Sequence, residues 1–370
     1  MDSIERVNKA INLEEPDRVP VAPLIGYEAA RFFDITIEEF FVNRKKAERA
    51  YEYTIDKLGG IDMVMLPSTY IDFYSPLSPS YSLYYCDWKL PGKELSGNVM
   101  PQFNEKPIMD ENGYDLLINE GLTHFLSLRK AGFWDLLKFF KAMKRNKAFY
   151  RKWFYERRVP MVSDTFTMLP FDMLALMRGL TIFLTDLYRR PEKVIEASDA
   201  LIDGLIALGE FPIKGFSGKI IFQGSQQASA EIISSNQFEK FCFPYLKRMT
   251  EEFAKDGLIS HLHHHGNWTP FLKYLGDFPK KKCILYLDDK TDISKAKEIL
   301  GDRMCLMGNI CASLLSLGTP KKVEKATKKI IDGCADGGGL IISCENPPDA
   351  QFENLKALVD TTKKYGVYRA

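Results

Sequence analysis

The sequence predicts an α/β fold of the (β/α)₈ TIM-barrel type, with a long aromatic-rich insertion after the second strand. Eight short apolar runs are bounded by turn residues, and amphipathic stretches of helical period lie between most of them. Strands that alternate with helices favour parallel βαβ units, and eight such strands favour a closed barrel. An open doubly wound sheet is the alternative, because a strand count from one sequence is easily wrong by one.

The 370 residues exceed the roughly 250 that a (β/α)₈ barrel needs. Hydrophobic residues make up 45% of the chain and charged residues 27%, which are ordinary values for a globular protein. We therefore expect residues 1–370 to form a single barrel domain. The expected strands are residues 19–25, 61–66, 159–162, 219–222, 258–265, 283–287, 304–307 and 340–344.

The chain is expected to begin with a helix over residues 3–13. Ile4, Val7, Ala10 and Ile11 fall on one face of this helix, and Pro16 ends it. The same helical period recurs between the later strands. It predicts helices over residues 37–58, 191–208, 236–255, 293–300, 321–334 and 352–365.

One connection, residues 68–158, is far longer than the others, since loops in compact domains are normally about 4–6 residues. It is rich in aromatic residues and proline. We expect a hairpin or extended loop there, followed by helices near residues 114–128 and 133–157. In a barrel such an insertion lies on the catalytic face and can cap the pocket as a lid. An accessory layer used for contacts in a homodimer is the equally favoured alternative.

The composition argues against several classes of protein. Lys and Arg total 50 against 49 for Asp and Glu, so there is no basic footprint for nucleic acid. No run of 18 apolar residues predicts a membrane span, and the start of the chain lacks the apolar core of a signal peptide. Seven scattered cysteines fit a reducing compartment better than a disulfide framework. We expect a cytoplasmic protein.

Four of the five histidines fall within five residues, as His261, His263, His264 and His265. If residues 258–265 form a strand, the first, second and fourth of these share one face and His264 points the other way. The run ends at Gly266, so the last imidazole lies at the carboxyl end of the strand, where barrel enzymes place catalytic groups. Two imidazoles at this spacing can bind one metal. A solvated histidine-rich loop is the alternative, but the cluster interrupts an apolar strand.

A third ligand is expected from Cys344, at the carboxyl end of the last strand. One thiolate and two imidazoles with an open position are typical of catalytic zinc. A buried structural cysteine is the usual reading of a lone cysteine. That reading fits Cys242, Cys283, Cys305, Cys311 and Cys334, which lie within apolar patterns.

Polar residues also follow other expected strands. Asp164, Gln223, Asp288 and Asn309 lie at strand ends and are candidates for orienting a ligating histidine. Glu231, in the loop after the fourth strand, is a candidate fourth ligand or proton acceptor, or simply a helix cap. We assign catalytic roles to Glu231 and Asp288, and substrate contacts to the other three.

Several stretches resemble the uroporphyrinogen decarboxylase superfamily, and within it the cobalamin-dependent methyltransferases. They are RVNKAINLEEPDRVPVAP at the start, HLHHHGN, LGDRMCLMGNICASLLSLGTPKKVEKATKKII, and the closing GGLIISCENPPDAQFENLKALVDTTKKYG. HLHHHGN is similar to the family's H-x-C-G-N zinc element, with His263 on its histidine and His265 on its cysteine. Cys344 falls on the family's second ligand cysteine. The resemblance implies a (β/α)₈ barrel, bound zinc, and methyl transfer to or from the cobalt of a corrinoid (cobalamin) carried by a partner protein.

Two departures from the family pattern narrow this expectation. The decarboxylases carry an R-Q-A-G-R element whose arginines bind substrate carboxylates, whereas here PLIGYEAARF leaves only Arg31 nearby. In addition, His265 replaces a thiolate, which leaves zinc more electrophilic and suited to polarising an ether oxygen.

We therefore expect a corrinoid-dependent O-demethylase that acts on an aryl methyl ether, a small-molecule methyl donor. A methylcobamide:thiol methyltransferase of the coenzyme M type is the main alternative. A porphyrinogen decarboxylase and a non-catalytic binding protein are less favoured. Aromatic side chains of the insertion are candidates to stack on the methoxylated ring, each with ordinary core packing as its alternative. They are Tyr70, Tyr74, Tyr84, Tyr85 and Trp88.

Overall fold

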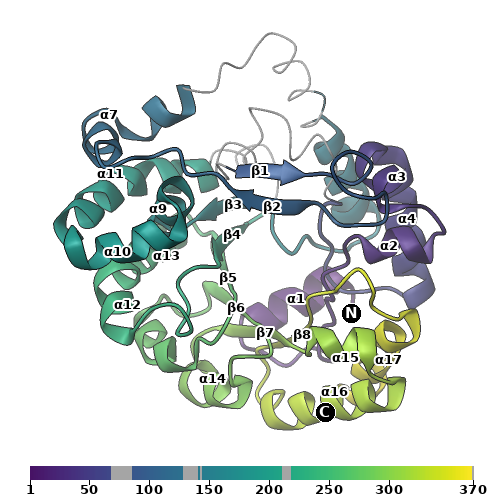
Figure 1. Cartoon of the computed structure of the whole chain (residues 1–370). Helices are drawn as coiled ribbons and strands as arrows, with labels where there is room; N and C mark the ends of the chain where they lie inside the picture. Colours follow the sequence, from purple (N-terminus) through teal and green to yellow (C-terminus); the bar gives the residue numbers. More distant parts are fainter. Residues whose placement is uncertain (68–85, 128–140, 142–143, 211–217, 369–370) are drawn as a thin grey trace.

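The computed structural model describes residues 1–67, 86–127, 141, 144–210 and 218–368. Six parallel strands pair in sequence order around its centre (Figure 1). Each neighbouring pair is joined by a helical connection, as βαβ units require. The strands are β3 (Thr165–Met168), β4 (Ile220–Ser225), β5 (Ile259–His264), β6 (Cys283–Leu287), β7 (Cys305–Asn309) and β8 (Leu340–Ser343).

Three extended segments complete the ring. Val21 forms a parallel bridge with Ile342 of β8, and Val64 forms one with Met161. The amide of Asp62 donates to the carbonyl of Val21 at 2.7 Å, which joins the first two segments. Residues 159–162 lead directly into β3, so the ring passes through eight strand positions and returns to its start. The predicted (β/α)₈ barrel is confirmed.

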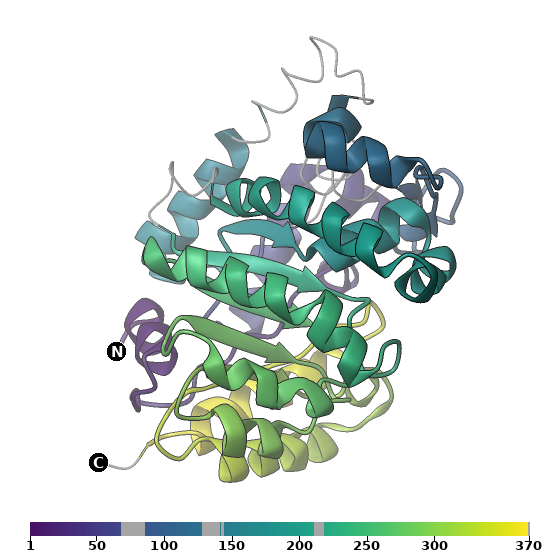
Figure 2. The same ribbon diagram turned by 90° about the vertical axis from the view of Figure 1, so that its left-hand side faces the viewer.

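Helices cover the outside of this ring, and Figures 1 and 2 show α10 to α17 wrapped around it. α1, α3 and α12 each begin with a capping box; in α1, Asp2 accepts from the amide of Glu5. The helices are α1 (Ser3–Ile11), α2 (Glu28–Phe32), α3 (Ile37–Val42), α4 (Arg44–Leu58), α7 (Gly113–Ser127), η1 (Lys152–Glu156), α9 (Pro170–Arg178), α10 (Leu180–Arg189), α11 (Pro191–Glu210), α12 (Ser235–Phe241), α13 (Phe243–Lys255), η3 (Thr269–Asp277), α14 (Ile293–Leu300), α15 (Ala312–Leu317), α16 (Pro320–Cys334) and α17 (Phe352–Tyr365). No helix among the described residues is long and apolar enough to cross a bilayer.

Strand side chains alternate between two apolar layers. Ile284, Tyr286 and Ile341 face the lumen and form one cluster with the apolar face of α1. Leu285 and Ile342, one residue along their strands, join the larger core beneath the helices. Successive side chains along each strand therefore alternate between the lumen and the layer beneath the helices.

The amino end of the barrel is closed by α1 and a buried ion cluster. Asp62, 1% exposed, accepts from Arg6 Nη1 and Arg18 Nη1, both at 2.7 Å. Burial raises the pKa of Asp62, but the hydrogen bond from Arg18 and the charges of both arginines leave it below its usual value. This end holds the barrel together and leaves the opposite end for chemistry.

The insertion forms a hairpin followed by helices, as predicted. β1 (Cys86–Lys89) pairs antiparallel with β2 (Gln102–Glu105), and α7 packs against α11. Residues 144–151 are helical and continue into η1. Whether this segment acts as a lid or as a dimer contact stays a prediction.

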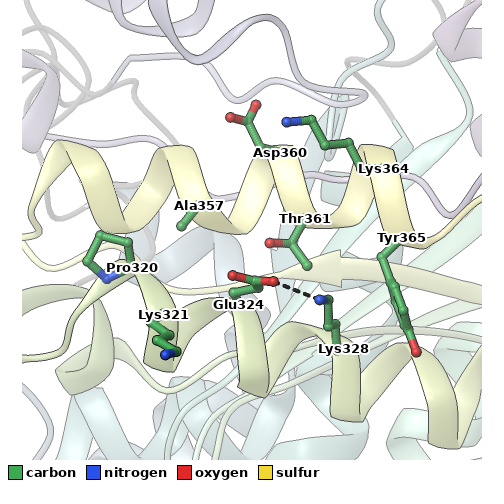
Figure 3. Close-up of a pocket in the computed structure, with 9 residues that line it drawn as sticks. All are labelled: Pro320, Lys321, Glu324, Lys328, Ala357, Asp360, Thr361, Lys364 and Tyr365. Carbon is green, nitrogen blue, oxygen red and sulfur yellow. Dashed lines mark hydrogen bonds and ion pairs between the residues drawn. The ribbon is translucent and has the colours of Figure 1, made fainter.

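A surface groove runs between α16 and α17 on the outside of the barrel (Figure 3). Lys328 donates to Glu324 at 2.7 Å within it and lies over the ring of Tyr365, 5.1 Å from the centroid. Every residue that lines the groove comes from one of these two helices. It is therefore separate from the strand ends, where barrel enzymes carry their active sites.

Candidate metal centre

The histidines divide between the two faces of β5 as the sequence predicted. The ring of His263 lies 5.4 Å from that of His261 and 4.8 Å from that of His265, so these three line the lumen side. His264 points outward and stacks on Trp268, with ring centroids 3.8 Å apart and planes 9° from parallel. Burial lowers the pKa of both His261 and His264, so both are neutral in the fold.

Two aromatic rings fix the orientation of His263. Phe222 of β4 stacks on one side at 4.7 Å, and Tyr286 of β6 stacks on the other at 4.2 Å and 13°. Held in this way, the imidazole places Nε2 3.0 Å from Oε1 of Glu345. Its other nitrogen, Nδ1, is buried without a hydrogen-bond partner among the described residues.

The resulting cluster is His263, His265 and Glu345, whose ligand atoms all lie within 4.8 Å of one another. Glu345 shares the odd-numbered, lumen-facing register of Ile341 on β8. Sequence reasoning missed this residue, although the alternation that placed the histidines would have found it.

Cys344 points away from the lumen, because it lies one residue out of that register. Its thiol is fully buried and donates to Oδ1 of Asn346 at 3.0 Å, and the amide of Asn346 donates to Glu28 at 3.0 Å. The cluster in the described structure therefore contains a carboxylate where a thiolate was expected. A ligand role for Cys344 stays a prediction.

Two of the three donor groups, His265 and Glu345, have pKa values shifted toward the protonation states that bind a metal ion. Burial lowers the pKa of His265 and the neighbouring His263 lowers it further, so the imidazole of His265 is neutral. Burial raises the pKa of Glu345, but the hydrogen bonds from His263 and Tyr286 bring it below its usual value, which favours the carboxylate. Two imidazoles and a carboxylate with further positions open fit zinc in a catalytic site, and the unpartnered Nδ1 of His263 agrees with a missing partner.

Loops from neighbouring strands hold the segment that follows His265. Asp288 accepts from the amide of Gly266 at 2.6 Å, and Glu231 accepts from the amide of Asn267 at 3.2 Å. Gly266 has a φ of 79°, and a Cβ there would lie 2.5 Å from the Glu231 carboxylate, so this turn requires glycine. Both carboxylates therefore position the loop, and their predicted catalytic roles stay predictions.

Asn309 extends this support from β7. Its Nδ2 donates to the carbonyl of Asp288 at 3.2 Å and to that of Thr291 at 2.9 Å. The hydroxyl of Thr291 in turn donates to the carbonyl of Gly266 at 3.0 Å. The amide of Asn309 thus contacts protein backbone, and its predicted contact with substrate stays a prediction.

Two residues predicted to contact substrate lie elsewhere. Gln223 faces away from the lumen and donates to Ser260 Oγ at 2.6 Å, because it follows the lumen-facing Phe222 by one residue. Asp164 precedes β3 and accepts from the amide of Ile220 at the amino end of β4. The extended chain there continues past residue 162 to Met168, so Asp164 lies at the end of the barrel opposite the histidines.

Of the five aromatic candidates from the insertion, the structure describes only Trp88. Trp88 packs edge-on against Phe103 across the β1–β2 hairpin, with centroids 5.8 Å apart. Its contact with substrate stays a prediction. Tyr70 lies outside the described residues, as do Tyr74, Tyr84 and Tyr85.

A small pocket adjoins the cluster and brings in residues that sequence reasoning missed. Asp172, in the first turn of α9, is buried and accepts from Ser225 Oγ at 2.9 Å. It also accepts from the amides of Gln226 and Gln227 at 2.7 and 2.9 Å, which fixes the loop after β4. Burial raises the pKa of Asp172 to about 6. The pocket is lined by Met168, Asp172, Leu176, Phe222, Gly224, Gln226, Gln227, His263 and His265.

Comparisons with known proteins agree with this architecture. The family model for uroporphyrinogen decarboxylase (URO-D) matches residues 148–365. A methylcobamide:CoM methyltransferase, MtbA, from Methanosarcina mazei is 30% identical over 139 residues, which cover 37% of this chain and 40% of the relative. A uroporphyrinogen decarboxylase from Coxiella burnetii is 26% identical over 145 residues, which cover 37% of this chain and 38% of the relative. The matched segments thus span about two fifths of these curated relatives.

The structural match covers much more of the chain than the sequence matches do. A solved structure described as a methyltransferase from Methanosarcina mazei superposes with a TM-score of 0.72 and 19% identity, covering 99% of both chains. The family model covers more than half of the present chain. The chain therefore belongs to the uroporphyrinogen decarboxylase (URO-D) family.

Proposed function

We propose that this protein is a metal-dependent methyltransferase that works with a corrinoid protein. The observation that carries the proposal is the cluster of His263, His265 and Glu345 at the carboxyl end of the barrel, with ligand atoms within 4.8 Å of one another. Similarity to a methylcobamide:CoM methyltransferase supports the same class of reaction. Zinc suits this donor set, and the thiol of Cys344 would join it only if the end of β8 turned toward the lumen.

We propose an aryl methyl ether as the methyl donor. When bound, zinc supplies a Lewis acid that polarises the ether oxygen. The methyl group passes to the cobalt of the reduced corrinoid: the C–O bond breaks, its electron pair stays on oxygen, and a Co–C bond forms. Two neutral imidazoles and one carboxylate dampen the Lewis acidity of the ion less than thiolates do, which favours a poor phenolate leaving group.

The residues of the chain have distinct tasks in this reaction. His263 is held flat between Phe222 and Tyr286, so its nitrogens keep a fixed direction. Asp288 and Glu231 hold the backbone beyond His265. This rigid arrangement holds the donor atoms in place before substrate arrives, which is the protein's contribution to catalysis.

Transfer of a methyl group to or from a thiol is the second candidate, and the name of the M. mazei relative favours it. Decarboxylation of a porphyrinogen is disfavoured by the surroundings of Arg31. The guanidinium of Arg31 donates to the backbone carbonyls of Pro348 and Ala350 and so ties α2 to the loop after β8. Two of its three nitrogens are thus engaged with backbone, which weakens it as a bidentate clamp for a substrate carboxylate.

The proposal is tested first by metal content of protein purified without an affinity tag. We expect about one zinc per chain in the wild type and little in His265→Ala or Glu345→Gln. His264→Phe is the matched control, because it keeps the stack on Trp268 and changes a histidine that points away from the cluster. Full zinc in His265→Ala would contradict the ligand assignment.

The second test measures the reaction. Wild-type protein with zinc is assayed with cob(I)alamin and a methoxyarene, and separately with methylcobalamin and a thiol, by the absorbance change of the corrinoid. Methylcobalamin formation from the methoxyarene would support the proposed direction. Turnover with the thiol alone would favour the second candidate, and no turnover in either assay would contradict corrinoid-dependent methyl transfer.

A further inference from the structure

A hollow of about 440 Å³ lies in the surface between α4 and the helical residues 144–152. Resting on the proposed function, we infer that this basic hollow docks an acidic surface of the corrinoid protein. Its place on the barrel, its cations without partners and the mixed character of its lining carry the inference. The hollow is lined by four cations and two carboxylates, namely Arg44, Lys45, Arg145, Lys152, Glu48 and Glu52.

The basic hollow lies at the same end of the barrel as the metal cluster. Nη1 of Arg44 donates at 3.0 Å to the carbonyl of Pro67, the residue that follows the second extended segment of the ring. His265 and Glu345 follow the carboxyl ends of β5 and β8. The carboxyl ends of all strands in a parallel barrel lie on one face. A protein that brings cobalt to the metal cluster approaches this face, and the basic hollow lies on its rim.

Ion pairs join α4 to the neighbouring helical segment away from this rim. Arg157 pairs with Asp56, and Lys152 pairs with Glu52. The two helical elements therefore run side by side in the same direction, toward the amino end of the barrel. In this part of the contact each of these cations has a carboxylate on the facing helix, so its charge has a structural explanation.

Toward the rim, the carboxylates no longer balance the cations. Arg44 pairs with Glu48 of its own helix at 2.8 Å and lies 5.8 Å from the centroid of the Phe149 ring. Lys45 and Arg145 are exposed, and neither side chain has a hydrogen bond or an ion pair among the described residues. The basic hollow therefore presents two positive charges that the fold does not use.

The position of Lys45 adds to this argument. It lies in the first turn of α4, which contains no acidic residue. The start of a helix carries a partial positive charge, so a carboxylate stabilises this position and a cation does not. Stability of the helix therefore does not account for the lysine, whereas an acidic partner would.

The distribution of charge favours a protein as this partner. Residues 144–158 contain seven lysines and arginines and one carboxylate, whereas the whole chain has 50 basic against 49 acidic residues. Charge concentrated in this way speeds the association of a complementary protein without requiring a large apolar contact. That suits two proteins that meet and separate in every turnover.

The same lining disfavours a nucleic acid. Glu48 and Glu52 lie within the hollow, where a continuous row of phosphates would meet like charges. Val42, which is 60% exposed, also lines the hollow and offers an apolar contact. Mixed charge with an apolar contact is typical of an interface between proteins.

The test compares two methyl acceptors, free cob(I)alamin and the corrinoid protein that this enzyme methylates, selected by its cobalt content and its rate in the assay. The measured quantity is kcat/KM for the corrinoid protein divided by kcat/KM for free cob(I)alamin. We expect this ratio to fall at least roughly tenfold in the double variant Lys45→Glu/Arg145→Glu, because electrostatic steering changes association rates by about 10–1,000-fold. A carboxylate in the first turn of α4 favours the helix, so loss of folding does not explain such a fall.

Two further double variants serve as controls. Lys45→Arg/Arg145→Lys keeps both charges and should keep the ratio near that of the wild type. Lys325→Glu/Lys329→Glu makes the same change of charge at exposed positions of α16 and should also leave the ratio near the wild-type value. An equal fall in the α16 variant, or none in Lys45→Glu/Arg145→Glu, would overturn the inference and leave the proposed function intact.

Two other outcomes separate the inference from its alternatives. Binding of a fluorescein-labelled single-stranded DNA oligonucleotide that is lost in Lys45→Glu/Arg145→Glu would assign the hollow to nucleic acid and overturn the inference. Methyl transfer to free cob(I)alamin that no corrinoid protein accelerates would overturn it as well. No methyl transfer to either acceptor by wild-type protein with bound zinc would overturn the proposed function itself.

Discussion

Removing one hydroxyl group tests whether Tyr286 holds the metal ligands in place. The ring of Tyr286 stacks on His263 at 4.2 Å and 13°, and a hydrogen bond from Tyr286 is among the causes that lower the pKa of the Glu345 carboxyl. Tyr286→Phe keeps the stack and removes only the hydrogen bond. The variant therefore separates the orientation of Glu345 from the packing of His263.

The size of the effect follows from the contact. A hydrogen bond to a charged group contributes about 1.5–3 kcal/mol. The Glu345 side chain is 41% exposed, so solvent screening favours the lower end of this range. About 1.5 kcal/mol corresponds to a roughly tenfold rise in the zinc dissociation constant. This agrees with the loss of about 10–100-fold usually caused by removing a partner of a ligand.

The assay is competition for zinc with a chromophoric chelator, measured for wild type, Tyr286→Phe, Glu345→Gln and the double variant. We expect the double variant to bind zinc no more weakly than Glu345→Gln alone, since the hydroxyl acts through the carboxylate. Wild-type affinity in Tyr286→Phe would refute the reasoning. Additive losses in the double variant would show that the hydroxyl acts by another route.

Two further predictions concern the rest of the barrel. Asp62→Asn should lower the free energy of unfolding by about 3–5 kcal/mol, because Arg6 and Arg18 would keep buried charges without their carboxylate. Urea unfolding measures this free energy, and a loss below about 1 kcal/mol would contradict the prediction. Burial raises the pKa of Glu28 from 4.5 to about 8, so the folded state retains a proton that the unfolded state releases. Its contribution to stability is complete below pH 4.5 and is lost as the pH rises through 8, by up to about 1.4 kcal/mol per pH unit. Glu28→Gln should remove this fall between pH 4.5 and 8 in the same unfolding assay, and parallel pH profiles of the two proteins would count against it.

The strands of the barrel were predictable because their signal is local. Apolar runs and turn residues located all eight, and alternation along residues 258–265 placed His263 and His265 on one face. On the last strand the prediction followed residue type and chose Cys344. Alternation of side chains along that strand favours Glu345 instead. The described structure thus adds Glu345 to the candidate ligands, and the role of Cys344 stays a prediction.

Other parts of the site depend on contacts that no local pattern contains. Asp164 was predicted to follow the third strand, but the strand continues beyond its apolar run to Met168. Pairing with β4, not hydrophobicity, decides where the third strand ends. The support of Gly266 by Asp288 and Glu231 joins loops from three strands. Asp172 lies after β3 but binds the loop after β4, so its role appears only when the two strands are adjacent.

The hydrogen bonds around Gly266 and Asn267 also bear on the entropy of metal binding. Ordering the backbone of one residue costs about 1–2 kcal/mol, and a ligand that must order a loop loses that amount from its affinity. Here side chains of Asp288, Glu231 and Thr291 fix the turn through hydrogen bonds with its backbone. The conformational entropy of that turn is lost when the protein folds. Metal binding therefore does not have to order the turn, and the affinity for the ion is not lowered by that entropy loss.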